Sequence, residues 1–232
     1  MSLEPLFLSL RLALCVSAIL LTLGMPLAHW LAFSHWRGKF LLEALVALPL
    51  VLPPTVLGFY VLLAMGPRGP LGRLWQGLFG HGLAFTFEGL VLASVLYSLP
   101  FAVQPLVASF ESVDRKLLDA SAILGATRWR TFWRIILPLS FPGVITALVL
   151  TFAHTLGEFG VVLMVGGNLP GVTRTVSIDI YDRVQALQYP EANRLALILL
   201  LFSFVTLSVV YAVNRRVAHD LAQRLWAPWT AK

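Results

Sequence analysis

The sequence of 232 residues has little charge. Charged side chains make up 12% of it, about half the share usual in a soluble globular protein, whereas 58% of the residues are hydrophobic. Its single cysteine, Cys15, allows neither an internal disulfide nor a cysteine-based metal site. The chain also lacks a Gly-x-x-x-x-Gly-Lys-Ser/Thr phosphate loop, because the glycine-containing run 66–72 has no lysine. These absences argue against most soluble enzymes and against nucleotide binding through a phosphate loop.

Most of the hydrophobic residues lie in five long apolar runs. A helix of roughly 20 residues crosses a hydrocarbon core of about 30 Å, and every run is long enough. The first run exceeds the 7–15 residues of a signal-peptide core, so we expect it to be a retained helix. Glu158 is the one charged residue within the runs. We predict an all-α integral membrane protein with a single domain, 1–232, and five transmembrane helices at about 12–33, 44–65, 89–110, 143–164 and 195–213.

The distribution of basic residues predicts the orientation. A net charge of +6 would suggest nucleic-acid binding in a soluble chain, but here it has a simpler explanation. Placing the loops 34–43 and 111–142 and the tail after Asn214 on one side collects eleven of the 17 basic residues there. The positive-inside rule makes that side cytoplasmic, although Arg11 argues weakly the other way. We therefore expect the N-terminus outside, the C-terminus in the cytoplasm, and membrane lipid but no nucleic acid as a partner.

Prolines interrupt the second and third predicted spans. Each removes a backbone donor and clashes with the preceding helical turn, which is tolerated where protein or a water-filled path supplies new partners. The segment 48–58 is therefore predicted to be a kinked helix at an internal interface. Pro53, Pro54 and Thr55 are candidates for a pathway or gate. The alternative is a kink that only shapes helix packing, because prolines are common in membrane helices.

The polar loop 112–138 predicts two short amphipathic helices at an angle. Gly125 can end the first helix with a positive φ, and Thr127 can cap the second. A helix-turn-helix that binds DNA and an interfacial helix on anionic lipid fit the same pattern, but DNA binding is disfavoured because both ends continue into spans. The expected apolar stripes are Val113, Leu117, Ala120 and Leu124, followed by Trp129, Phe132, Trp133 and Ile136.

The spacing within this loop resembles the EAA loop of binding-protein-dependent ABC importer permeases. That pattern is Glu-Ala-Ala, three residues, Gly, nine residues, and Ile-x-Leu-Pro. Here Asp119-Ala120-Ser121 stands first, with Asp for Glu and Ser for the second Ala, and Gly125 follows after three intervening residues. The resemblance implies that 112–138 is the coupling loop that docks on a cytoplasmic ATPase. The residues carried over to this role are Asp119, Ala120, Ser121, Gly125, Ile135, Leu137 and Pro138.

Further segments are similar to the molybdate ABC transporter permeases, from about residue 8 to residue 213. They are 48–58, 66–72, 157–160 and 168–175, and sulfate, thiosulfate and tungstate permeases share them in part. The resemblance implies import of a tetrahedral oxyanion, molybdate first, across a bacterial inner membrane. It also implies a homodimer, two ABC ATPase subunits and an extracytoplasmic oxyanion-binding protein. A dimer of this chain with a paralogue is the alternative to the homodimer. No cofactor is expected in this chain, because the ATPase subunits bind ATP.

His154 and Glu158 are four residues apart in the predicted fourth span, which places them on one face of that helix. An intramembrane carboxylate is a functional candidate because its burial is costly without a partner. Two ligands are too few for a metal site, and a carboxylate repels a nearby anion. We predict a hydrogen-bonded role beside the pathway or in a gate, with Gly157 and Gly160 allowing close helix approach. A membrane-embedded enzyme using these two residues and an ATP-independent channel are the alternatives, and neither explains the loop spacing.

Residues 166–191 lie outside the membrane in this topology. Val176, Ile180 and Val184 have helical spacing and indicate a short amphipathic helix with Asp179 and Asp182 on its polar side. One interpretation is an interfacial helix that seals the mouth of the bundle. The family resemblance implies instead contact with the extracytoplasmic binding protein.

Overall fold

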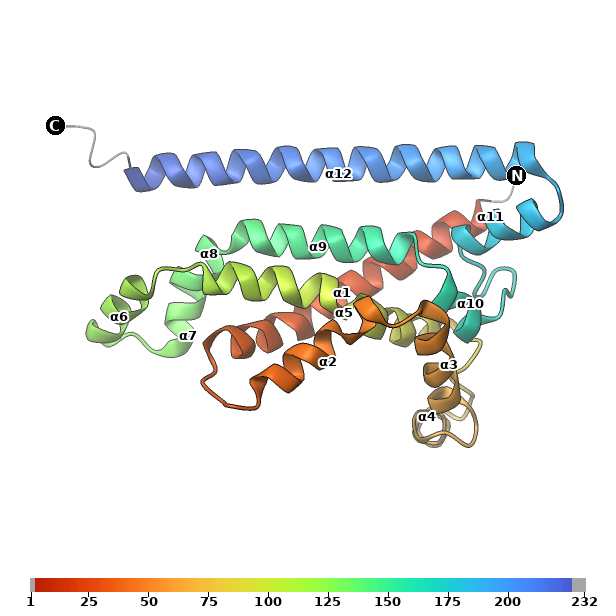
Figure 1. Ribbon diagram of the computed structural model, residues 1–232, viewed down its shortest axis with the longest axis horizontal. Helices are drawn as coiled ribbons and strands as arrows, with labels where there is room; N and C mark the ends of the chain where they lie inside the picture. Colours follow the sequence, from red (N-terminus) through yellow and green to blue (C-terminus); the bar gives the residue numbers. More distant parts are fainter. Residues whose placement is uncertain (1–2, 227–232) are drawn as a thin grey trace.

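The computed structural model describes residues 3–226, and every regular element in this range is a helix. Residues 1–2 and 227–232 of the predicted domain 1–232 lie outside the described residues. The long helices lie lengthwise in the molecule, and the short helices cluster at its two ends (Figure 1). The predicted all-α integral membrane class is confirmed. The long helices are α1 (Glu4–Phe33), α5 (Phe87–Glu111), α9 (Phe141–Leu156) and α12 (Tyr189–Trp226).

Five membrane crossings are available in the described chain when bent helices are included. The helices α1 and α5 and the segment Tyr189–Val209 of α12 are each long and apolar enough to cross a bilayer alone. Two bent pairs qualify when each is counted as one span. The first joins α2 (Lys39–Val51) to α3 (Pro54–Met65) at 113°, and the second joins Arg128–Leu139 to α9 at 71°.

Helix α5 lies at the centre of the bundle, where it packs against α1, α9, α2 and α10 (Gly160–Gly166). Small residues make this close packing possible. Ala93, Ala102 and Ser94 of α5 are completely buried, and a Cβ added at Gly143 of α9 would collide with the side chain of Ser109. The N-terminus of α5 is capped by Thr86 Oγ1, which accepts a hydrogen bond from the Gly89 amide at 3.1 Å.

The second predicted span is broken rather than kinked. Pro53 and Pro54 follow one another, so neither supplies an amide hydrogen to the preceding turn. Leu52, just before them, has φ −70° and ψ 134°, the extended conformation favoured before proline. Helix α3 then starts at Pro54, the position at which a missing amide costs least.

The fourth predicted span, 143–164, is not one continuous helix. Helix α9 ends at Leu156, and α10 begins at Gly160. Glu158 therefore lies in a non-helical segment, and the expectation that it shares a helical face with His154 is wrong. Two glycines within four residues weaken the helix at this point.

Two short helices near the end opposite the loop 112–138 differ from the sequence expectations. Helix α4 (Pro70–Phe79) was not predicted; it starts at a proline and ends at Gly80, which has a φ of +76°. Helix α11 (Val176–Gln185) was predicted, but its polar side was assigned incorrectly. Asp179 is only 5% exposed, and its carboxylate pairs with Arg183 at 3.0 Å.

Candidate functional site

The first helix of the loop 112–138 is defined at both ends by local hydrogen bonds. At the start of α6 (Arg115–Ile123), Asp114 Oδ1 accepts a bond from the Lys116 amide at 2.9 Å. At its end, the Gly125 amide donates to Ala122 O and the Ala126 amide to Ser121 O, which is a Schellman motif. Gly125 has a φ of +72°, as predicted, and a Cβ there would meet no atom within 4 Å. Glycine is thus required at this position by backbone conformation and not by lack of space.

The second short helix, α7 (Arg128–Thr131), is fixed to the first by a hydroxyl pair. Thr127 caps α7 by accepting a bond from the Arg130 amide at 3.3 Å, as predicted. Ser121 Oγ lies 2.8 Å from Thr131 Oγ1, and Ser121 is buried. These bonds join α6 and α7 into one corner, residues 114–131, which we call the loop corner.

Apolar side chains of α6 and its C-cap residue are exposed beside the charged side chains of Arg115, Lys116 and Asp119. Leu117, Ile123 and Leu124 are 45%, 86% and 85% exposed, and Asp119 and Ala120 are also exposed. Of the predicted stripe Val113, Leu117, Ala120 and Leu124, the body of the protein covers only Val113, and the other three residues are exposed. An exposed apolar surface of this kind is typical of a protein-binding surface.

The polypeptide after α7 continues through a π-helix, η1 (Phe132–Ile136), and one helical turn, α8 (Leu137–Leu139). Phe132 and Ile136 are buried, whereas Trp129 and Trp133 are 71% and 49% exposed. The second predicted stripe thus contributes only half of its residues to the core. Of the predicted coupling residues in this segment, Ile135 and Leu137 pack against the core and Pro138 is exposed.

Glu158 belongs to a buried polar cluster at the break between α9 and α10. Its side chain is 4% exposed, and Oε2 accepts a hydrogen bond from Ser94 Oγ of α5 at 2.6 Å. The other carboxylate oxygen is buried and has no hydrogen-bond partner among the described residues. In this conformation Glu158 cannot contact a solute in an open path, because both oxygens are enclosed.

His154 joins the same cluster from the last turn of α9. Ser98 Oγ lies 2.9 Å from His154 Nδ1 and 3.0 Å from Thr155 Oγ1. The imidazole stacks on Phe101 with 3.9 Å between the ring centroids. The centroid of the Tyr97 ring lies 4.8 Å from the centroid of the imidazole. We call Ser94, Ser98, His154, Thr155 and Glu158 the junction cluster.

The two serines of the junction cluster are not among the predicted site residues, although the sequence carries a signal for them. Ser94 and Ser98 are four residues apart in one apolar run of the sequence, and His154 and Glu158 are four residues apart in another. Matching spacing on two spans indicates that two pairs of polar groups can meet when the helices lie side by side.

The two broken spans touch one another near the junction cluster. A Cβ added at Gly160 would lie 2.8 Å from Pro54 Cβ, and one at Gly58 would lie 2.9 Å from Met164 Cβ. Helices α3 and α10 therefore approach as closely as glycine permits. Pro53 and Thr55, which flank Pro54, are exposed, whereas Glu158 is enclosed.

The segment between α10 and α11 is held by a polar network. Asn168, which has a φ of +61°, donates to Asp182 Oδ2 and accepts from Arg174 Nε, each at 2.6 Å. Leu169 and Val172 remain 44% and 45% exposed on this structured segment. Within residues 3–226, no group of three or more His, Cys, Asp or Glu side chains could hold a metal ion.

Comparison with known proteins gives consistent matches over nearly the whole chain. The profile of the family described as "Binding-protein-dependent transport system inner membrane component" matches residues 21–219. A molybdenum transport system permease protein of Azotobacter vinelandii is 53% identical over 208 residues, which cover 90% of this chain and 92% of the relative. A probable sulfate transport system permease protein of Chlorokybus atmophyticus is 31% identical, and the match covers 91% of this chain and 74% of that relative.

The fold also matches a solved transporter. A bacterial alginate ABC transporter, crystallised with a periplasmic protein that holds an alginate pentasaccharide, aligns with a TM-score of 0.70 at 19% identity. The alignment covers 92% of this chain and 80% of that one.

Proposed function

The chain belongs to the family of binding-protein-dependent transport system inner membrane components, and from this premise we propose that it imports molybdate. It is the membrane permease subunit of an ABC importer and not an enzyme. Molybdate is proposed because the chain is 53% identical to the molybdenum permease but only 31% identical to the sulfate permease. Tungstate, thiosulfate and sulfate are the competing oxyanions of similar shape.

The loop corner is the proposed contact with the ATPase. The exposed apolar side chains of Leu117, Ile123 and Leu124 support this role, because they lie on α6 and its C-cap, and α6 is at one end of the molecule (Figure 1). Asp119 and Ala120 are exposed beside them, whereas Ser121 and Gly125 shape the corner from within. Ile135, Leu137 and Pro138 would transmit movement of the corner into α9.

The assembly we propose is a homodimer with two ABC ATPase subunits on the cytoplasmic side of a bacterial inner membrane. An extracytoplasmic oxyanion-binding protein would dock at the opposite end. The structured segment 167–175, with Leu169 and Val172 exposed, supports that docking site.

Transport would proceed by alternating access between two global states. Closure of the ATPase dimer on ATP would bring the two loop corners together and open the spans outward. Hydrolysis would reverse the movement and release the anion into the cytoplasm. The junction of Pro53, Pro54 and Thr55 with Gly157, Glu158 and Gly160 is the proposed gate region.

Transport assays test this function directly. The full chain is co-expressed with its ATPase, reconstituted in vesicles and supplied with binding protein and labelled molybdate. We expect uptake that requires ATP and is competed by tungstate more strongly than by sulfate. Uptake without ATP would indicate a channel, and stronger competition by sulfate would reassign the cargo.

Cysteine labelling tests the proposed orientation, with the N-terminus outside and the C-terminus inside. In a Cys15→Ser background, Trp129→Cys should react with an impermeant thiol reagent only from the cytoplasmic face, and Leu169→Cys only from outside. Both side chains are exposed, so accessibility depends on the side of the membrane. The opposite pattern would overturn the orientation and the assignment of the loop corner to the ATPase.

A further inference from the structure

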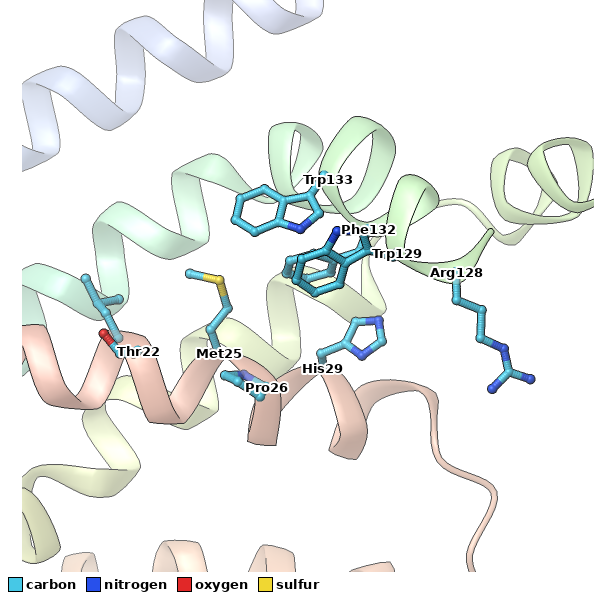
Figure 2. Close-up of a pocket in the computed structure, with 9 residues that line it drawn as sticks. Thr22, Met25, Pro26, His29, Arg128, Trp129, Phe132 and Trp133 are labelled. Atoms are coloured by element: carbon cyan, nitrogen blue, oxygen red, sulfur yellow. The ribbon is translucent and has the colours of Figure 1, made fainter. Parts of the chain in front are cut away.

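A groove of about 520 Å³ runs between α1 and the segment formed by α7 and η1 (Figure 2). Met25, Pro26 and His29 of α1 form one wall and face Trp129, Phe132 and Trp133 on the other. Arg128 extends from the end of the groove, away from Thr22. The walls are therefore almost entirely apolar, and the cation lies at one end.

The length of the groove corresponds to one leaflet of a bilayer. Leu21 and His29 are its outermost α1 residues, and eight residues at about 1.5 Å rise give about 12 Å along the helix. Half of a hydrocarbon core measures about 15 Å. Since Leu21 lies near the middle of α1, the groove extends from the interface at Arg128 to about the centre of the bilayer.

The aromatic wall is typical of the boundary between lipid and water. Tryptophan is enriched at that boundary, where its ring contacts lipid and its N–H contacts polar groups. Trp129 and Trp133 are both substantially exposed although they lie beside a buried core that includes Phe132. The short side chains of Thr22 and Pro26 leave the space opposite them open.

The charge at the end of the groove favours an anion. Arg128, Arg130 and Arg134 are exposed within two helical turns, and none of them forms an ion pair within the described part of the chain. No carboxylate is among the described residues that line the groove. Basic clusters on the cytoplasmic side of membrane helices attract anionic lipid head groups.

We propose that the groove binds one anionic phospholipid of the cytoplasmic leaflet. One acyl chain lies between Met25 and Trp133, and the phosphate accepts hydrogen bonds from the Arg128 guanidinium. This assignment to the cytoplasmic leaflet rests on the orientation proposed above, with the loop corner on the cytoplasmic side of the membrane. It places a lipid between α1 and the segment that joins the loop corner to α9, so lipid composition would influence coupling.

Fluorescence quenching by brominated lipid tests this site in the purified full-length protein. Nanodiscs of phosphatidylcholine receive the same small fraction of either dibrominated phosphatidylglycerol or dibrominated phosphatidylcholine. The difference between the wild type and Trp133→Phe isolates the signal of Trp133. We expect phosphatidylglycerol to be preferred roughly fivefold, the factor that corresponds to about 1 kcal/mol per basic side chain at an anionic surface.

Two arginine variants provide the decisive comparison. Arg128→Gln should reduce the preference for phosphatidylglycerol to about that of the bulk bilayer. Arg37→Gln should leave the preference unchanged, because Arg37 is exposed on the loop between α1 and α2 and does not line the groove. Equal quenching by both lipids would overturn the anionic site. Absence of Trp133 quenching would mean that protein, such as a second copy of the chain, covers the groove, and would also overturn it. Both leaflets of a nanodisc are identical, so a wrong orientation would not change these results.

Discussion

The loop corner and the junction cluster are built by opposite means. Within the loop corner, hydrogen bonds join residues at most ten positions apart, as between Ser121 and Thr131. In the junction cluster, the bonds from Ser98 to His154 and from Ser94 to Glu158 join residues 56 and 64 positions apart. The corner can therefore keep its shape while it moves as a unit. The junction depends on the relative positions of α5, α9 and α10, so a movement of these helices must alter its bonds.

The two regions also differ in what they bury. The loop corner exposes apolar side chains such as Ile123 and Leu124, whereas the junction cluster encloses a carboxylate and partly buries an imidazole. Exposed apolar residues favour binding of a partner, and enclosed polar groups are costly unless they are bonded. Substitutions in the corner should therefore change coupling to the ATPase. Substitutions in the junction should change stability or transport rate.

The largest effect is expected at the contact between the two broken spans. Gly160→Ala places a Cβ at 2.8 Å from Pro54 Cβ, and overpacking of this kind costs about 1–3 kcal/mol. Gly157→Ala is the matched control, because its Cβ would meet its nearest atom at 3.7 Å. Thermal unfolding of the purified protein should show a clearly lower midpoint for Gly160→Ala alone. Equal midpoints would mean that α3 and α10 do not form a tight contact.

The next largest effect is expected at the loop corner. Gly125→Val forces a β-branched residue to a φ of +72°, which costs about 1–2 kcal/mol, and should tilt α6 relative to α7. Such a free energy corresponds to about a tenfold loss of ATP-driven uptake, while the protein still inserts. Gly77→Val is the control, because Gly77 is also in open space but lies within helix α4. Normal uptake by Gly125→Val would contradict the coupling role.

Features determined by neighbouring residues could be predicted from the sequence. The first, third and fifth apolar runs, the positive φ of Gly125 and the cap at Thr127 depend on local chemistry, and the structure agrees with them. The family resemblance rested on the spacing from Asp119 to Pro138, and the family match confirms it. In these cases local propensity and the fold favour the same structure.

Features determined by distant contacts could not be predicted. Periodicity placed Leu117 and Leu124 in one apolar stripe, but only the fold shows that this face is left uncovered. The same limit applies to Asp179, which the fold buries although the sequence places it on the polar side of its helix. A sequence pattern gives the face on which a residue lies; it does not specify what covers that face.

A smaller effect is expected when the junction loses its charge. Glu158→Gln keeps the shape of the side chain and an acceptor for Ser94, so we expect less than about a tenfold change in the maximal uptake rate, under about 1.4 kcal/mol. The half-saturating anion concentration should not change, because both oxygens of Glu158 are enclosed. Glu88→Gln, an exposed residue of the first turn of α5, is the control. A strongly lowered half-saturating concentration with an unchanged maximal rate would place Glu158 against the anion.

The smallest effect is expected at Ser121. Ser121→Ala removes the hydroxyl contact with Thr131, and a single neutral hydrogen bond contributes about 0.5–1.5 kcal/mol. We expect the low end of that range, because Thr131 Oγ1 also donates to Thr127 O at 3.2 Å and so keeps a partner. A double-mutant cycle with Thr131→Val, read by thermal unfolding and by uptake, isolates the contact. A coupling energy near zero would show that the Schellman motif alone holds the corner. A coupling energy above that of one neutral bond would show that the hydroxyl pair, and not the backbone at Gly125, sets the angle between α6 and α7.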